Sequence, residues 1–150
     1  MREINVERSM KVPRSAVWSV LADFPNISRW NGGVAKSFAT SEATGGVGAK
    51  RHCDLSPAGE LEETILEWEP NAKMVVSIDS AKKLPIKSGL ATFSLSDDGP
   101  STSSTRIDYR YETKWGLIGT LMGPILDGQL RKGFVGFLTD LEKEADKTSA

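Results

Sequence analysis

The stretch LMGPILDGQLRKGFVGFLTDLEKEA, residues 121–145, has the clearest periodicity in the chain. Its apolar residues recur at steps of three and four, which is typical of one amphipathic α-helix. They are Leu121, Met122, Ile125, Leu126, Leu130, Phe134, Phe137, Leu138 and Leu141. Pro124 is expected to kink this helix or to mark where its regular part begins. The sequence therefore predicts one long C-terminal helix with an apolar side.

The residues before this helix change to the period of two that is typical of strands. Residues 2–12 form a predicted opening strand, and two short helical segments begin at Pro13 and Pro25. Further strands are expected over residues 34–40, 48–55, 60–68, 74–80, 86–96 and 105–114, with a polar hairpin loop beginning at Asp97. Six or seven strands at this spacing indicate a curved antiparallel sheet. The long helix is the element able to cover its apolar face, so we expect an α+β fold with a pocket between sheet and helix.

Composition and charge narrow the class of protein. A chain of 150 residues is expected to form a single domain over 1–150. Its 19 basic and 20 acidic residues give a net charge of −1, which argues against nucleic acid as a partner. One cysteine and the absence of a signal-like or membrane-length apolar run predict a cytoplasmic protein without stable membrane insertion. We expect no cofactor, no metal, and a monomer or weak homodimer.

Three stretches together resemble the helix-grip (SRPBCC) superfamily of START lipid-transfer domains, polyketide cyclases/dehydrases and birch-pollen-allergen-like proteins. They are VPRSAVWSVLADFPNISRW (residues 12–30), GAKRHCDLSPAGELEETILEWEP (48–70) and LRKGFVGFLTDLEKEA (130–145). The chain is most similar to the polyketide cyclase/dehydrase and lipid transport family. This resemblance implies a sheet wrapped around the C-terminal helix and a hydrophobic cavity for lipids, polyketides, hormones or other apolar molecules. It does not decide between carriers and enzymes, because one fold hosts many functions.

The one histidine of the chain, His52, is adjacent to its one cysteine, Cys53. Neighbouring side chains of a strand point to opposite faces, so these two cannot converge on one substrate or one metal ion. No other Cys or His is present to complete a zinc site. We therefore interpret His52 as a surface residue and Cys53 as a small buried thiol.

Arg51 and Glu63 are the charged pair predicted to face the pocket. A hairpin turn at residues 56–58 places Arg51 across from Glu63, on the face shared with Ile65. Buried charges need a partner, because uncompensated desolvation costs several kcal/mol. The pair could anchor a carboxylate, hydroxyl or carbonyl of a ligand, or it could be a purely structural ion pair.

Aromatic and aliphatic residues supply the other candidate ligand contacts. Tyr109 and Tyr111 share one face of the last strand and would offer apolar walls with hydroxyl tips. Trp30 is expected at the pocket rim. The remaining candidates are Phe38, Val76, Met122, Ile125, Leu126, Gln129 and Phe134, together with Ile65. For the aliphatic members, simple core packing is the alternative.

These observations predict a protein that binds or transports a hydrophobic small molecule in an internal cavity. The alternative is a polyketide cyclase or dehydratase that uses the same cavity, with a tyrosine or Arg51 assisting proton transfer. A third possibility is an interaction module with a vestigial pocket. The absence of a convergent His, Cys or paired-carboxylate site disfavours the enzyme, and the sequence leaves this question open.

Overall fold

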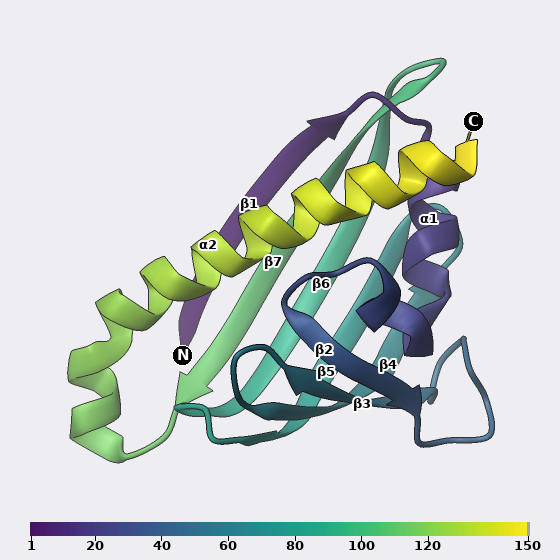
Figure 1. Ribbon diagram of the computed structural model, residues 1–150. Coiled ribbons are helices and arrows are strands. Elements are labelled where there is room, and N and C mark those ends of the chain that lie inside the picture. The colour runs from purple at the N-terminus through teal and green to yellow at the C-terminus, as the bar shows by residue number, and fades with distance from the viewer. Residues whose placement is uncertain (150) are drawn as a thin grey trace.

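Seven strands of the computed structural model, which describes residues 1–149, form one antiparallel sheet in the order β1-β7-β6-β5-β4-β3-β2 (Figure 1). The strands are β1 (Arg2–Met10), β2 (Val34–Ala39), β3 (Lys50–Leu55), β4 (Glu60–Glu69), β5 (Lys73–Lys82), β6 (Ile86–Gly99) and β7 (Thr102–Thr113). The helices are α1 (Arg14–Ala22), the 3-10 helix η1 (Phe24–Arg29) and α2 (Gly116–Ser149). The predicted helix-grip fold of class α+β is confirmed. Ala150, the last residue of the expected domain, lies outside the described residues.

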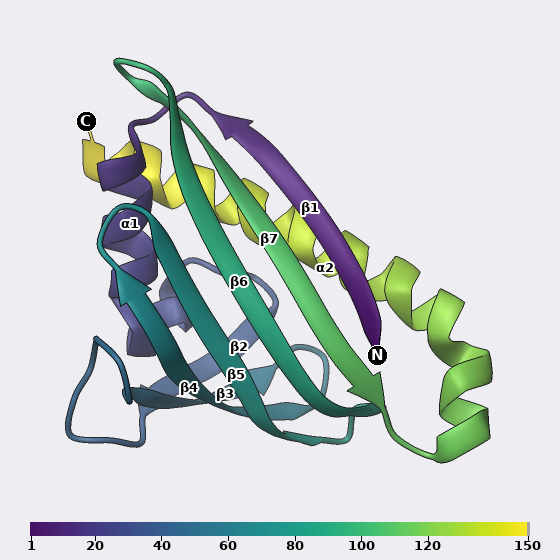
Figure 2. The same cartoon turned by 180° about the vertical axis from the view of Figure 1, so that it is seen from behind.

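Helices cover one face of the sheet and leave the other bare. Helix α2 crosses the sheet diagonally and also packs against α1 (Figure 1), while the view from behind shows strands with no helix in front of them (Figure 2). Residues that face α2 are therefore apolar and alternate with polar ones, as in β1, where Ile4 and Val6 are buried between exposed Glu3, Asn5 and Glu7. This alternation explains why the strand prediction succeeded.

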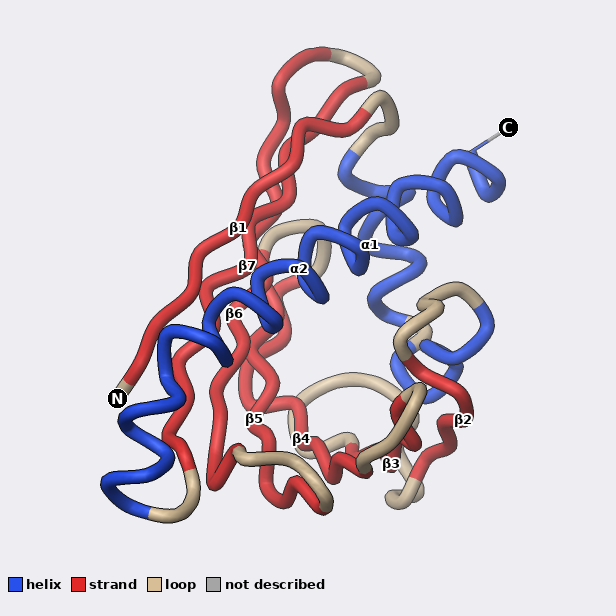
Figure 3. Tube along the Cα trace, turned by 60° about the vertical axis from the view of Figure 1, so that its left-hand side comes forward, coloured by secondary structure: helices blue, strands red, loops and turns tan. Residues whose placement is uncertain are grey.

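The sheet curls strongly between its two edges. Strands β2 and β3 run at a steep angle to β6 and β7, and β4 makes the turn between these directions (Figure 3). The β4–β5 ladder has register shifts between Glu62 and Glu63 and between Ile65 and Glu67. Such bulges bend a strand and increase its twist, which lets β2 and β3 curve around the helix-covered face.

Helix α2 is held to the sheet by the second part of its apolar stripe. Phe137, Leu138, Leu141 and Ala145 are buried at steps of one, three and four residues. The first turns of α2 lie at an angle to the rest of the helix (Figure 1), and Pro124 falls inside the helix rather than at its start. A proline within a helix removes one backbone hydrogen bond and bends the axis, so the predicted kink is the physical reason for this change of direction.

The hairpin between β6 and β7 differs from the sequence prediction. The residues from Asp97 onward were expected to form a polar loop, but β6 continues to Gly99 and β7 begins at Thr102. The Ser103 hydroxyl donates a hydrogen bond to the carbonyl oxygen of Val12 at 2.8 Å. Pairing with β1 satisfies the backbone groups of β7, and contacts such as this hydrogen bond satisfy its polar side chains, so these hydroxyl residues are accommodated in a strand.

The helices found among residues 1–149 include none with an apolar stretch long enough to cross a lipid bilayer.

Candidate ligand pocket

A pocket of about 260 Å³ lies between the curled sheet and α2. We call it the sheet–helix pocket. Its lining consists of Ile27, Asn31, Gly33, Val34, Arg51, Cys53, Leu55, Leu61, Glu63, Ile78, Leu84, Ile86, Ala91, Phe93, Tyr109, Gln129, Leu130, Gly133, Phe134 and Phe137. Most of these residues are apolar, and a few polar groups are grouped among them, as is usual for sites that take small molecules. A dry cavity of roughly 150 Å³ accommodates benzene, so this pocket has room for a molecule larger than one ring.

The charged pair in this pocket is Arg51 with Glu63. The two residues face each other across the β3–β4 hairpin, which confirms the predicted register. Arg51 Nε donates to Glu63 Oε1 at 2.9 Å, and the exposed fractions of the two residues are 6% and 7%. Arg51 Nη1 donates to the carbonyl oxygen of Phe24 at 2.9 Å, and the guanidinium carbon lies 3.8 Å from the centre of the Phe24 ring. These contacts compensate the desolvation of the guanidinium.

Cys53 lies beside this pair, and its thiol is unreactive near neutral pH. Its Sγ donates to Glu63 Oε1 at 3.4 Å. Burial raises the pKa of the thiol to about 12, and the nearby positive charge of Arg51 only partly opposes this effect. A thiol with such a pKa remains protonated near neutral pH and is a weak nucleophile.

Tyr109 places a hydroxyl group in the pocket. Its ring packs against Phe134 with the ring centres 5.1 Å apart, and its hydroxyl lies over Gly89, where a Cβ would come within 2.5 Å of the oxygen. Glycine at position 89 therefore makes room for this side chain. Burial first, and the charge of Glu63 second, raise the pKa of Tyr109, so its hydroxyl remains protonated at physiological pH.

Tyr111 was also predicted to contact ligand, but it does not line the sheet–helix pocket. Its hydroxyl donates to Asp127 of α2, and the Asp127 carboxylate pairs with Arg2 of β1 at 2.6 Å. Burial and the hydrogen bond to Asp127 raise the pKa of Tyr111 to about 12. The Arg2 guanidinium, followed by the Tyr111 hydrogen bond, holds the pKa of Asp127 below its usual value despite partial burial. Tyr111 thus joins α2 to the sheet edge.

The other predicted site residues fall into three groups. Gln129 and Phe134 line the sheet–helix pocket. Trp30 and Val76 line a separate void of about 10 Å³ beside Arg51, and the Trp30 ring packs edge-on against Phe137. The predicted residues that line neither space are Phe38, Ile65, Met122, Ile125 and Leu126.

Each residue of that last group lies outside the pocket lining for a physical reason. Ile65 and Leu126 are buried in the core, with exposed fractions of 0% and 6%. Met122 and Ile125 lie in the first part of α2, where they are 37% and 61% exposed. Phe38 points to the outer face of the sheet, where it stacks on His52 with the ring centres 5.0 Å apart. None of these five residues lines the sheet–helix pocket, and for Ile65 and Leu126 the structure shows the core packing that was the stated alternative.

Most of the residues that line the pocket were not among the predicted ligand contacts, and Leu84, Phe93 and Gly133 are three of them. Phe93 could have been found, because Ala91, Phe93 and Leu95 alternate as the buried positions of β6. Leu84 belongs to the β5–β6 loop, and Gly133 has no side chain, so neither carries a periodic signal.

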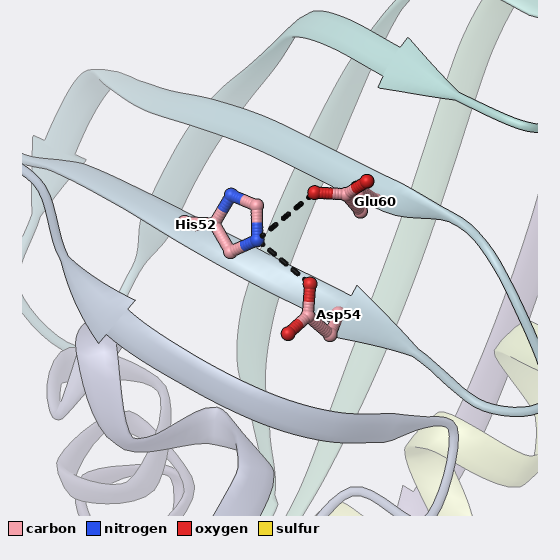
Figure 4. Close-up of side chains that lie close together, drawn as sticks. All are labelled: His52, Asp54 and Glu60. Atoms are coloured by element: carbon pink, nitrogen blue, oxygen red, sulfur yellow. Dashed lines mark hydrogen bonds and ion pairs between the residues drawn. The ribbon is translucent and has the colours of Figure 1, made fainter.

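His52 lies on the face of β3 opposite to the buried Cys53, as strand alternation predicted. Figure 4 shows its ring beside Asp54 and Glu60. Its Nε2 is 2.8 Å from Asp54 Oδ1 and 3.6 Å from Glu60 Oε1, and its Nδ1 bonds Glu62. The hydrogen bonds to Glu62 and then to Asp54 raise the pKa of His52. The expectation of no metal rested on Cys and His as ligands, whereas in the structure Asp54 and Glu60 add carboxylate donors. With His52, their ligand atoms lie within 4.8 Å of one another, a spacing that could hold a divalent cation.

The raised pKa of His52 predicts a pH-dependent stability. Because the folded pKa exceeds the unfolded value of about 6.5, the imidazolium contributes fully below about pH 6.5, and this contribution is lost as pH rises through the folded pKa. For a partly exposed cluster we expect an effect of roughly 1 kcal/mol. Urea unfolding of the wild type and His52→Gln at several pH values measures it. A stability difference that stays constant from mildly acidic to alkaline pH would contradict the prediction.

The curled sheet, the long helix across it and the pocket between them define the class of helix-grip, START-like proteins. The chain matches the model of the family described as "Polyketide cyclase / dehydrase and lipid transport" over residues 1–146. It belongs to this family.

Solved structures share the fold at low sequence identity. A START superfamily protein from Mycobacterium smegmatis is 12% identical to this chain, with a TM-score of 0.82. The match covers 97% of this chain and 98% of that protein. The Zhui aromatase/cyclase from Streptomyces sp. R1128 is 14% identical, with a TM-score of 0.81, and the match covers 99% of this chain and 96% of the cyclase. Protein MLL2253 from Mesorhizobium loti is 22% identical with a TM-score of 0.74, and both coverages are 98%. No curated protein matches the chain. At these identities the structures establish the fold alone.

Proposed function

We propose that this protein binds, and carries, an apolar small molecule in the sheet–helix pocket. The observation that carries the proposal is the pocket of about 260 Å³, with its apolar lining and the Arg51–Glu63 pair within it. Burial of apolar ligand surface would drive binding at about 25 cal/mol per Å², before the costs of ordering ligand and side chains. Family membership is consistent with this function, because the family's description includes lipid transport.

The titration of the pocket groups favours binding over catalysis. A general acid or base works best when its pKa lies near the working pH. Burial moves the pKa of Cys53 to about 12 and also raises the pKa of Tyr109, so both groups remain protonated and hold their protons more tightly. A cyclase or dehydratase remains the second candidate, since the family's description also includes cyclases. It requires turnover of a polyketide-like substrate that Tyr109→Phe abolishes while binding persists.

Gly133→Leu is the variant that tests the binding proposal. Gly133 lies on α2 at the pocket, and a Cβ at this position meets no atom within 4 Å. A leucine can therefore enter the pocket space without disturbing the fold, and it removes a helix glycine that costs about 1 kcal/mol. We expect at least a tenfold loss of affinity for naphthalene, measured by chemical-shift changes in amide NMR spectra, with stability equal to or above that of the wild type.

Gly128→Leu is the matched control. It makes the same change in the same helix, also with no atom within 4 Å of the new Cβ, but position 128 does not line the pocket. Its affinity for naphthalene should equal that of the wild type. If wild-type protein shows no saturable shifts with naphthalene, or if both leucine variants bind as the wild type does, the binding proposal is wrong.

A further inference from the structure

The charge of the sheet–helix pocket is internally balanced. Among the described residues that line it, Arg51 and Glu63 are the charged ones, and each is the other's partner at 2.9 Å. The remaining polar lining groups are the side chains of Asn31, Cys53, Tyr109 and Gln129, none of which is charged near neutral pH. The pocket therefore offers no spare cation and no spare anion to a charged ligand.

Arg51 is also less available to an anion than its charge suggests. Nε is used by Glu63, Nη1 by the backbone carbonyl of Phe24, and one side of the guanidinium by the Phe24 ring. A ligand carboxylate would have to share Arg51 with the Glu63 carboxylate inside an apolar space. Desolvating this second negative charge without a second cation is costly.

Two groups of the pocket remain free to bind an uncharged polar group. The Tyr109 hydroxyl has no protein hydrogen-bond partner within residues 1–149, and no buried side-chain polar atom there is left unsatisfied, so this hydroxyl faces open pocket space. The side-chain hydrogen bonds that Glu63 accepts from Arg51 and Cys53 both end on Oε1. Its Oε2 can therefore accept a further hydrogen bond. The Tyr109 hydroxyl lies over Gly89 of β6, which pairs with Ile78 of β5, and Ile78 in turn pairs with Glu63 of β4. The two groups therefore lie in one row across the pocket face of the sheet.

We propose that the sheet–helix pocket selects an uncharged apolar ligand that carries a hydroxyl group, and that it discriminates against carboxylates. The ligand hydroxyl donates to Glu63 and accepts from Tyr109, while its apolar body lies among the side chains of β6 and α2. This inference rests on the proposed binding function and specifies its ligand class. A ligand hydroxyl gains hydrogen bonds to Glu63 and Tyr109, whereas a purely apolar ligand leaves this capacity for hydrogen bonding unused.

A matched set of probes tests the inference with unmodified protein. Naphthalene, 2-naphthol and 2-naphthoate share one ring system and differ in a single substituent, and at neutral pH the last is an anion. We expect 2-naphthol to bind more tightly than naphthalene, and at least tenfold more tightly than 2-naphthoate, in amide NMR titrations. Equal or tighter binding of 2-naphthoate would overturn the inference while the binding function stands. If none of the three binds, the proposed function fails and the inference with it.

Two variants locate the selectivity. Glu63→Gln removes the negative charge that opposes an anion, so the preference for 2-naphthol over 2-naphthoate should shrink or reverse. Tyr109→Phe removes the free hydroxyl, so the ratio of 2-naphthol to naphthalene affinity should fall several-fold. The second variant supplies the test even if Glu63→Gln folds poorly. An unchanged ratio in Tyr109→Phe would show that the hydroxyl is not recognised in this pocket and would overturn the assigned contact.

Discussion

Replacing Glu63 with alanine is expected to lower the free energy of unfolding by about 3–5 kcal/mol, the range observed when one partner of a buried ion pair is removed. Glu63 and Arg51 are 7% and 6% exposed, and the remaining contacts of Arg51 with Phe24 cannot neutralise its charge. The guanidinium would remain largely desolvated without a counter-ion. Urea unfolding followed by tryptophan fluorescence measures the loss.

Glu62→Ala is the control for this experiment. Glu62 neighbours Glu63 on β4, but it points to the outer face, where its side chain is 41% exposed and bonds His52. We expect it to cost at most about 1 kcal/mol. The double replacement of Arg51 by Met and Glu63 by Leu should recover much of the stability that Glu63→Ala loses, because it leaves no unpaired charge. If Glu63→Ala costs no more than Glu62→Ala, the Arg51 charge is hydrated in the folded protein.

Leu141→Ala is expected to cost about 2–5 kcal/mol, as large-to-small substitutions in well-packed cores do. Leu141 is 0% exposed and belongs to the part of α2 that closes the core between β1, β7 and α1. The change removes apolar contacts and leaves a cavity under the helix. Thermal and urea unfolding should both report the loss.

Leu121→Ala gives the matched comparison on the same helix. Leu121 belongs to the same sequence repeat, yet it is 80% exposed. Its truncation should change the free energy of unfolding by no more than about 0.5 kcal/mol. Equal losses for the two variants would mean that the first part of α2 is packed as tightly as the second, contrary to the structure.

The β3–β4 hairpin shows how far local sequence rules reach. A turn at residues 56–58 sets the pairing of the two strands, and a slip by one residue would move every side chain to the opposite face. Arg51 was therefore predictable as the partner of Glu63, and His52 as the outward neighbour of Cys53. The information lies within a short segment, because register and alternation are local properties.

Helix α2 marks the limit of such rules. Periodicity identified its apolar stripe but treated all members alike, so Met122, Ile125 and Leu126 were assigned to the pocket wall together with Phe134. In the folded protein only part of the helix lies over the sheet, because the first turns of α2 lie at an angle to the rest of the helix (Figure 1). The exposure of Met122 and Ile125 depends on where the sheet ends, which no period within the helix encodes.

Tyr109 and Tyr111 of β7 also share one face of an element, yet only one of them lines the pocket. Alternation correctly placed both on the face toward α2, where their rings stack with centres 5.5 Å apart. Only Tyr109 reaches the sheet–helix pocket, because Asp127 of α2 and Arg2 of β1 hold Tyr111. Glu60 and Asp54 join His52 for a related reason, since the pairing of two strands brings their side chains together.

The sequence by itself determined the order of the elements, the face on which strand residues lie, the Arg51–Glu63 register and the fold class. These follow from backbone geometry and the alternation of apolar and polar residues, which act over a few positions. Tertiary structure alone decided which inward-facing residues line open space and which are packed solid. That outcome depends on the curl of the sheet and the angle of α2, two properties set jointly by residues more than a hundred positions apart, such as Arg2 and Asp127.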